Sequence, residues 1–320
     1  MPISEFDIIQ KYFKQASSRN DVELGIGDDA AVTTVPEGKE LVIAIDTLVA
    51  GVHFFPDINP ADIAYKALAV NLSDLAAMGA EPAWFTLALT TPTADEVWFE
   101  SFSKGLFELA SQYDLQLIGG DTTQGPLTIT IQIAGYVPAA KALTRSGAQI
   151  GDRVFVTGSI GDAAAGLHCL KQSSEKQSEL IGRLHRPVPR VDIGQSLRDI
   201  ASACIDVSDG LAADLKHILA ASKVGAQIQL EQLPASNVFK NFVKNIDEQY
   251  ALMLGGGDDY ELCFTAPENK INQIELIAKQ CHCEITQIGE ITETKELAFY
   301  QNGEPYEGDK IDTGYIHFKD

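Results

Sequence analysis

The chain has 320 residues, of which 45% are hydrophobic and 22% charged, values of a globular protein long enough for two domains. Its 24 basic and 45 acidic residues give a formal net charge of −21, which excludes broad-surface binding to nucleic acid because no basic field displaces counterions. No segment is apolar enough to predict a membrane span, and the N-terminus lacks the features of a signal peptide. We therefore expect a cytoplasmic protein with no nucleic-acid and no membrane partner.

Five cysteines, an odd number without paired spacing, agree with a reducing compartment. The run Cys281-His282-Cys283 has no second Cys/His pair nearby, so we do not expect it to hold zinc. Cys204 and Cys263 lie in apolar runs and are expected to be small core residues.

Apolar periodicity predicts the elements of the first part of the chain. In order, these are a helix over 4–17, a buried strand over 41–45 that delivers Asp46 at its end, a helix from 60 or 61 to 78, a strand over 84–89, a helix over 94–113, a short strand over 115–118 that ends in Gly119-Gly120-Asp121, and a strand over 127–137.

The segment over 144–152 is rich in turn-forming residues and is followed by a second series of predicted strands. We place a domain boundary just before it, giving domains over 1–140 and 141–320. The second part is predicted to contain a strand over 153–157, a helix after Gly158-Ser159-Ile160-Gly161-Asp162, a helix over 190–201, a strand ending at Ile205, a helix over 211–222, strands over 260–264 and 285–288, and a less regular tail from 292.

Nine aspartates lie in six short clusters, most of them beside an apolar run. The clusters are Gly27-Asp28-Asp29, Ile45-Asp46-Thr47, Ser73-Asp74-Leu75, Gly119-Gly120-Asp121-Thr122, Asp206-Val207-Ser208-Asp209-Gly210 and Gly257-Asp258-Asp259. One such cluster is more often a simple turn, because Asp and Gly both favour turns. Six of them favour a site in which cations separate carboxylates that would otherwise repel one another. Magnesium prefers oxygen ligands and completes its coordination shell with phosphate oxygens. The aspartate clusters therefore predict phosphoryl transfer from a nucleotide.

The commonest nucleotide and nucleophile signatures are absent from the sequence: no Gly-rich loop ends in Gly-Lys-Ser/Thr, no dinucleotide fingerprint follows a strand, and neither a nucleophile elbow nor the protein-kinase motifs occur. The aspartate clusters are therefore the main chemical signal. We expect metal-assisted transfer without a covalent nucleophile, since the positioning and neutralisation of charge dominate phosphoryl transfer.

The order of these motifs resembles the thiamine-monophosphate kinase family, within the aminoimidazole ribonucleotide synthetase-like superfamily. The resemblance covers nearly the whole chain and rests on the runs 25–32, 46–54, 71–80, 119–123, 206–211 and 256–262. It implies a two-domain fold of the α/β (α+β) class, with mixed sheets covered by helices, and a homodimer. It also implies that ATP phosphorylates thiamine monophosphate to thiamine diphosphate, the last step in making that cofactor, with the help of several Mg²⁺ ions.

Residue by residue, the resemblance assigns metal ligands, ATP contacts and substrate contacts. The metal ligands are Asp29, Asp46, Asp74, Asp121, Asp206 and Asp209; the ATP contacts are Gly120, Asp121, Arg145 and Ser208; the substrate contacts are His53, Asp258 and Tyr315. From the sequence alone, Arg145 is equally well a surface arginine, His53 is more often a packed histidine, and Tyr315 reads as a surface aromatic.

Two departures from the family pattern are visible. Asp258 stands where the family usually has Glu, and Ala44 and Ile45 lack the hydroxyls that usually precede the aspartate at 46. Two alternatives remain open at this point: another enzyme of the superfamily, acting on a ribonucleotide amide or on selenide, and a non-catalytic regulator that binds metal or nucleotide. The missing N-terminal cysteine argues against a selenide enzyme, and the full set of acidic clusters argues against a regulator.

Overall fold

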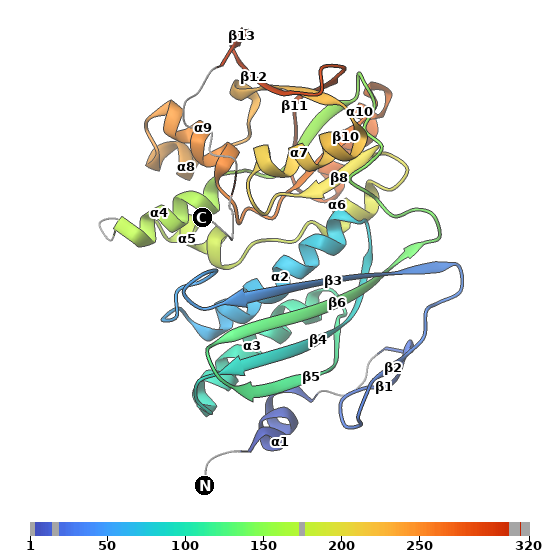
Figure 1. Cartoon of the computed structure of the whole chain (residues 1–320), viewed down its shortest axis with the longest axis vertical. Helices are drawn as coiled ribbons and strands as arrows, with labels where there is room; N and C mark the ends of the chain where they lie inside the picture. The colour runs from blue at the N-terminus through green and yellow to red at the C-terminus, as the bar shows by residue number, and fades with distance from the viewer. Residues whose placement is uncertain (1–3, 15–18, 173–176, 307–313, 315–320) are drawn as a thin grey trace. The chain divides into compact units, whose positions relative to one another are not determined.

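The computed structural model describes residues 4–14, 19–172, 177–306 and 314. The chain forms two compact units (Figure 1), one of Met1–Leu75 and Ala80–Ala140, the other of Ala76–Gly79 and Lys141–Asp320. The elements of the first part of the chain are α1 (Glu5–Ile8), η1 (Ile9–Phe13), β1 (Val22–Leu24), β2 (Val32–Thr33), β3 (Lys39–Val49), α2 (Pro60–Ala77), β4 (Glu81–Thr91), α3 (Glu96–Gln112), β5 (Gln116–Gln124) and β6 (Thr128–Pro138).

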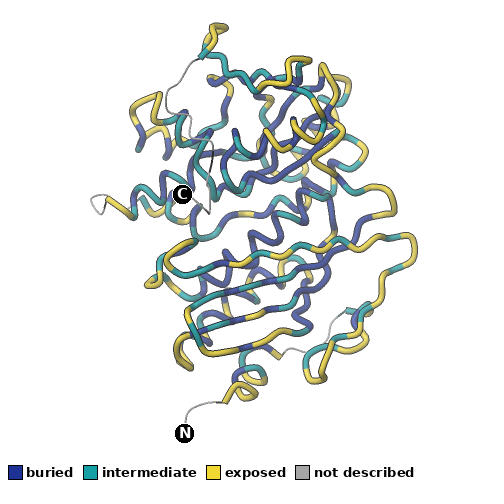
Figure 2. Tube along the Cα trace, viewed as in Figure 1, coloured by how far each residue is buried: buried dark blue, intermediate teal, exposed yellow. Residues whose placement is uncertain are grey.

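The first unit is built on a mixed four-stranded sheet in the order β3-β6-β4-β5, in which only the β4–β5 pair is parallel. Helices α2 and α3 lie on one face of this sheet (Figure 1). Pro60 opens α2 at a position where its missing N–H has no partner to lose. Asp95 caps α3 by accepting a hydrogen bond from the N–H of Val97 at 2.9 Å. Both predicted helices are thereby confirmed, and α2 is buried along most of its length (Figure 2).

The N-terminal helix is shorter than the predicted span 4–17. Ser4 and Asp7 form a capping box, but α1 gives way to the π-helical turn η1, which ends at Phe13. Phe6 is 80% exposed, whereas Ile8 and Phe13 are buried. The ring of Phe13 packs edge-on against Phe99 of α3 and fixes this segment to the unit.

Two strand predictions were wrong in a way that matters for the site. The strand over 41–45 was expected to be buried with Asp46 at its end, but among the described residues β3 is an edge strand paired with β6, and Asp46 lies within it. Ile45 is 62% exposed on the outer face of the strand. Likewise, Gly120 and Asp121 lie within β5, which continues to Gln124 beside β4, rather than after its end.

The second unit carries, within its described residues, a mixed seven-stranded sheet in the order β13-β12-β9-β11-β7-β10-β8. Its elements are β7 (Arg153–Thr157), α4 (Asp162–Gln172), α5 (Ser178–His185), α6 (Val191–Ser196), β8 (Ala203–Asp206), α7 (Leu211–Ser222), β9 (Gly225–Gln229), η2 (Leu230–Gln232), α8 (Asn237–Phe242), α9 (Ile246–Gly255), β10 (Leu262–Ala266), η3 (Glu268–Lys270), α10 (Ile271–Gln280), β11 (Ile285–Thr292), β12 (Leu297–Gln301) and β13 (Glu304–Pro305).

The core of the second unit includes residues of strands β7 and β8, where Val154, Val156 and Ile205 are almost fully buried. Cys204 and Cys263 are both buried, and Cys263 packs in this core, so their prediction as core residues is confirmed. Helix α7 has the predicted bounds, whereas the helix predicted over 190–201 ends at Ser196. Within the described residues, no helix has the length and apolar character that crossing a membrane requires.

Candidate functional site

A pair of carboxyl groups joins β3 to α2 in the first unit. Successive side chains of a strand alternate between its faces, so Asp46 points opposite to Ile45 and meets Asp74 of α2. The two side chains interact closely enough for Asp74 to lower the pKa of Asp46. Burial raises the pKa of Asp46, while the interaction with Asp74 and the charge of His53 act in the opposite direction.

His53, in the turn that follows β3, is the third side chain near this carboxyl pair and acts electrostatically on Asp46. Its Nδ1 accepts a hydrogen bond from the N–H of Val49 at 2.9 Å, which fixes the orientation of the ring. The structure thus brings Asp46, Asp74 and His53 together, although they were assigned to two different roles.

A second set of predicted residues lines a cavity of about 950 Å³ in the same unit. Asp29 reaches it from the loop between β1 and β2, and Gly120 and Asp121 reach it from β5. Gly120 has a φ of +151°, and a Cβ built there would lie 1.9 Å from the carbonyl oxygen of Leu87 on β4. Only glycine therefore allows β5 to pass β4 at this point and expose its backbone to the cavity.

In the second unit, the loop after β8 and the loop before β10 lie side by side. The N–H of Asp258 donates to the carbonyl of Ser208 at 2.9 Å, and the N–H of Tyr260 donates to the carbonyl of Val207 at 2.8 Å. Val207 in turn donates to the carbonyl of Glu261 at 2.8 Å. Four predicted site residues are brought together by this irregular ribbon: Asp206, Ser208, Asp209 and Asp258.

Asp214, which the sequence reasoning did not select, organises the first of these loops. Its Oδ2 accepts hydrogen bonds from the N–H groups of Ser208, Asp209 and Gly210 at 2.9, 3.0 and 3.2 Å. Burial raises the pKa of Asp214 to about 7, and the charge of Asp206 acts in the same direction. The available signal was an acidic residue in the first turn of the helix predicted over 211–222.

Two predicted residues stand apart from these sets. Arg145 is exposed on the segment between β6 and β7, where its carbonyl accepts a hydrogen bond from the hydroxyl of Ser222. Tyr315 lies outside the described residues.

The carboxyl groups have the chemistry of a magnesium site. The carboxyl groups of Asp46 and Asp74 interact directly, and two such groups repel each other when both are ionised, so a divalent cation can stabilise the pair. Asp29 and Asp121 line the same cavity, where a cation could lie near both carboxyl groups. Over the described part of the chain, no group of three or more His, Cys, Asp or Glu side chains is already gathered in a metal-binding arrangement.

Comparison with known proteins places both halves of the chain in one family of domains. Residues 27–137 match the family model of the AIR synthase related protein, N-terminal domain, and residues 149–302 match that of the AIR synthase related protein, C-terminal domain. The thiamine-monophosphate kinase of Escherichia coli (strain K12) is 52% identical over 327 residues, which cover 99% of each protein.

Two solved structures resemble the chain over most of its length. The crystal structure of thiamine-monophosphate kinase from Stenotrophomonas maltophilia K279a has a TM-score of 0.85 and 44% identity, covering 90% of this chain and 93% of that one. AaThiL complexed with AMPPCP and TMP has a TM-score of 0.78 and 32% identity, covering 92% of each chain. The expected α/β class, with two domains and mixed sheets covered by helices, is thereby confirmed.

Proposed function

We propose, from the premise that this chain belongs to the thiamine-monophosphate kinase family, that it transfers the γ-phosphate of ATP directly to the phosphate of thiamine monophosphate and so forms thiamine diphosphate. A relative of 32% identity has been solved with the ATP analogue AMPPCP together with TMP, which supports both substrates. The acceptor is an ionised phosphate oxygen, so the reaction needs alignment and charge neutralisation more than a strong base.

The observation that carries the proposal is the local gathering of residues from distant segments. Asp46 meets Asp74 across 28 positions of sequence, the cavity joins Asp29 to Asp121, and two backbone hydrogen bonds join the loop of Ser208 to that of Asp258 and Tyr260. Carboxyl groups that served only their own local structure would not be expected to lie together, because like charges repel.

Magnesium is part of this proposal, and six aspartates would hold it. Asp29, Asp46, Asp74 and Asp121 belong to the first unit, and Asp206 and Asp209 belong to the second. When bound, the ions would neutralise phosphate charge and align the two anions. Ile45 points away from Asp46, so we propose that any further ligand from this stretch is a main-chain carbonyl or water.

Nucleotide and substrate contacts follow the same reasoning. We assign ATP contacts to Gly120, Asp121, Arg145 and Ser208, and substrate contacts to His53, Asp258 and Tyr315. Gly120 has no side chain, so a phosphate group can approach its backbone closely. The exposed guanidinium of Arg145 can donate hydrogen bonds to phosphate oxygens. The carboxylate of Asp258, one methylene shorter than the usual Glu, suits the cationic thiazolium ring of the substrate.

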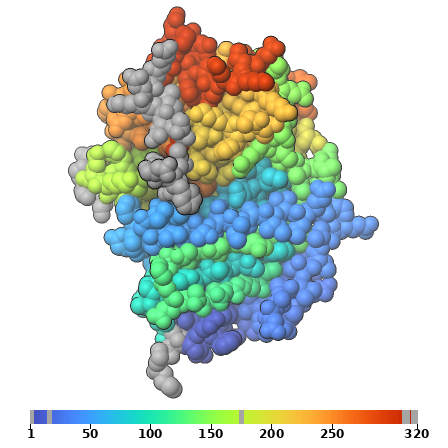
Figure 3. All heavy atoms as spheres, viewed as in Figure 1, coloured from blue at the N-terminus to red at the C-terminus, as the bar shows by residue number. Residues whose placement is uncertain are grey.

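We also propose that the enzyme works as a cytoplasmic homodimer that buries the outer face of the four-stranded sheet. Leu41, Ile43 and Ile45 alternate along β3 and are 38%, 54% and 62% exposed. The strands of this sheet form the surface turned towards the viewer in Figure 3, and among the described helices of the unit, α2 and α3 lie on the opposite face. An uncovered apolar edge strand of eleven residues is a surface that proteins normally protect.

The test is a coupled assay with ATP, magnesium and either thiamine monophosphate or free thiamine, with separation of the products. We expect thiamine diphosphate from the monophosphate and no turnover of free thiamine. Asp74→Asn and Asp121→Asn should each lower kcat/KM at least about a hundredfold, since each removes a metal-binding charge, whereas Asp57→Asn, at an exposed turn, should not. Turnover of free thiamine alone would refute the proposal, and near-normal activity of either variant would refute its assigned role.

A further inference from the structure

The four residues Asp258–Glu261 present their side chains in two opposed pairs. Asp258 and Tyr260 have φ values of +71° and +51°, and the hydroxyl of Tyr260 donates to Oδ1 of Asp258 at 3.2 Å. Asp259 and Glu261 are almost completely buried, at 2% and 0% exposure. Two left-handed residues that are not glycine, separated by a single position, are unfavourable unless the surroundings hold them.

One anchor of this turn is Asp259, whose carboxyl group reaches the N-terminus of α4. Its carboxylate oxygens accept hydrogen bonds from the N–H of Gly161 at 2.7 Å and of Ala163 at 3.3 Å. The backbone donors that open a helix are a common site for a bound anion. Here the carboxyl group of Asp259 takes up these donors, so this glycine-containing loop holds the turn rather than a ligand.

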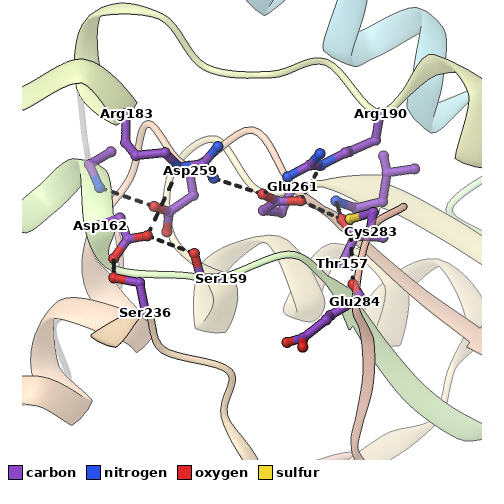
Figure 4. A network of polar contacts seen from close by, with 12 residues as sticks. Thr157, Ser159, Asp162, Arg183, Arg190, Ser236, Asp259, Glu261, Cys283 and Glu284 are labelled. Atoms are coloured by element: carbon purple, nitrogen blue, oxygen red, sulfur yellow. Dashed lines mark hydrogen bonds and ion pairs between the residues drawn. The ribbon is translucent and has the colours of Figure 1, made fainter. Parts of the chain in front are cut away.

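The other anchor is Glu261, at the centre of the network in Figure 4. Arg190 donates two hydrogen bonds to its carboxylate, from Nε to Oε2 and from Nη2 to Oε1, each 2.6 Å long. Arg183 adds a bond of 2.7 Å to Oε1, and the hydroxyl of Thr157 on β7 adds one of 2.6 Å to Oε2. The same hydroxyl accepts from the N–H of Leu262, which ties the network to the first residue of β10.

We propose that Arg190 is a positioning residue for substrate: through its two-bonded ion pair with Glu261, it fixes the turn that presents Asp258. The inference rests on the proposed substrate contact of Asp258. The planar guanidinium fork matches both carboxylate oxygens, whereas a lysine at this position would keep the charge and lose the fork. Arg190 lies in the segment between α5 and α6, remote in sequence from the turn that it holds.

The experiment is a double-mutant cycle on the full-length enzyme with Arg190→Lys, Asp258→Asn and the double variant. We expect Arg190→Lys to raise the KM for thiamine monophosphate about tenfold, because small misplacements of a positioning group cost up to about a hundredfold. The KM for ATP should change by less than about threefold, since among the described residues only one of the four assigned ATP contacts, Ser208, is bonded to this turn, and it is bonded through its main-chain carbonyl. On the Asp258→Asn background, Arg190→Lys should have no further effect on the KM for thiamine monophosphate, because the group that it positions is already lost.

Arg183→Lys serves as the second variant should Arg190→Lys fail to fold, because it loosens one bond to Glu261 and leaves the fork in place. We expect a rise in KM for thiamine monophosphate that is smaller and again absent on the Asp258→Asn background. Arg153→Lys, at an ion pair with Glu268 elsewhere in the same unit, is the matched control and should leave both KM values unchanged.

The outcomes separate this inference from the proposed function. No turnover of thiamine monophosphate by the wild-type enzyme would contradict the function itself. A normal wild type, with Arg190→Lys lowering only the melting temperature, would overturn the positioning role. An equal rise in KM on both backgrounds would overturn it too, because Arg190 would then act independently of Asp258.

Discussion

Asp259 is a buried carboxyl whose protonation should be visible in the stability of the folded protein. Burial raises its pKa to about 8, whereas aspartate in an unfolded chain titrates near about 3.9. Between about pH 4 and about pH 8, folding is therefore coupled to uptake of a proton by Asp259. The contribution of this group to the free energy of unfolding is fully present below about pH 4 and is lost as the pH rises towards about 8.

We predict that Asp259→Asn gains stability relative to wild type as the pH rises from 5 to 8, by up to about 1.4 kcal/mol per pH unit, although it loses a hydrogen bond at every pH. Denaturant unfolding of both proteins across this range measures the difference. Asp57→Asn, at an exposed position, is the control and should track wild type. A difference between Asp259→Asn and wild type that does not vary with pH would contradict the prediction.

At the scale of residues, sequence reasoning selected Asp46, Asp74 and Asp121 from their clusters and from resemblance, and these assignments stay predictions. It could not find the supports of the site. Asp214 caps the loop of Ser208 and Asp209 from the following helix, and Glu261 meets Arg190 across 71 positions. Such partners depend on how remote segments are packed, which local spacing does not encode.

At the scale of elements, Gly120 decides whether β5 can pair with β4. A Cβ at this position would overlap the carbonyl of Leu87, and its φ of +151° is strained for any other residue. We predict that Gly120→Ala lowers stability by about 3 kcal/mol or more and abolishes activity. Gly119→Ala is the matched control, because the nearest atom, a methyl of Thr86, lies 3.9 Å from the added Cβ. Equal melting temperatures for the two variants would show that β5 can move aside.

Elements with long apolar periodicity were predicted well, as the agreement for α2, α3 and α7 shows. The errors arose where an apolar run was taken to mean burial. In β3 the run Leu41–Ile45 alternates between a helix-covered face and an open one. The N-terminal helix was overextended because its hydrophobic pattern does not reveal the π turn η1. Short strands such as β1, β2 and β13 carry too few residues for a pattern.

At the scale of the whole molecule, the proposed homodimer makes a prediction about size. The double variant Ile43→Glu/Ile45→Glu should be monomeric in sedimentation or light scattering, because two buried charges per copy would lose their water on association. Val97→Glu, on α3 at a side chain that is 75% exposed, is the control and should leave the assembly intact. A wild-type protein that sediments as a monomer at micromolar concentration would reject the interface.

The open apolar face of β3 also has a consequence for how the enzyme should be handled. Each copy carries a net charge of −21, so the two halves of the proposed dimer repel one another, most strongly where few salt ions screen them. Apolar contact also weakens on cooling. Dilute enzyme kept on ice in a salt-free buffer should therefore fall apart and lose activity, and warming it with added salt should restore that activity.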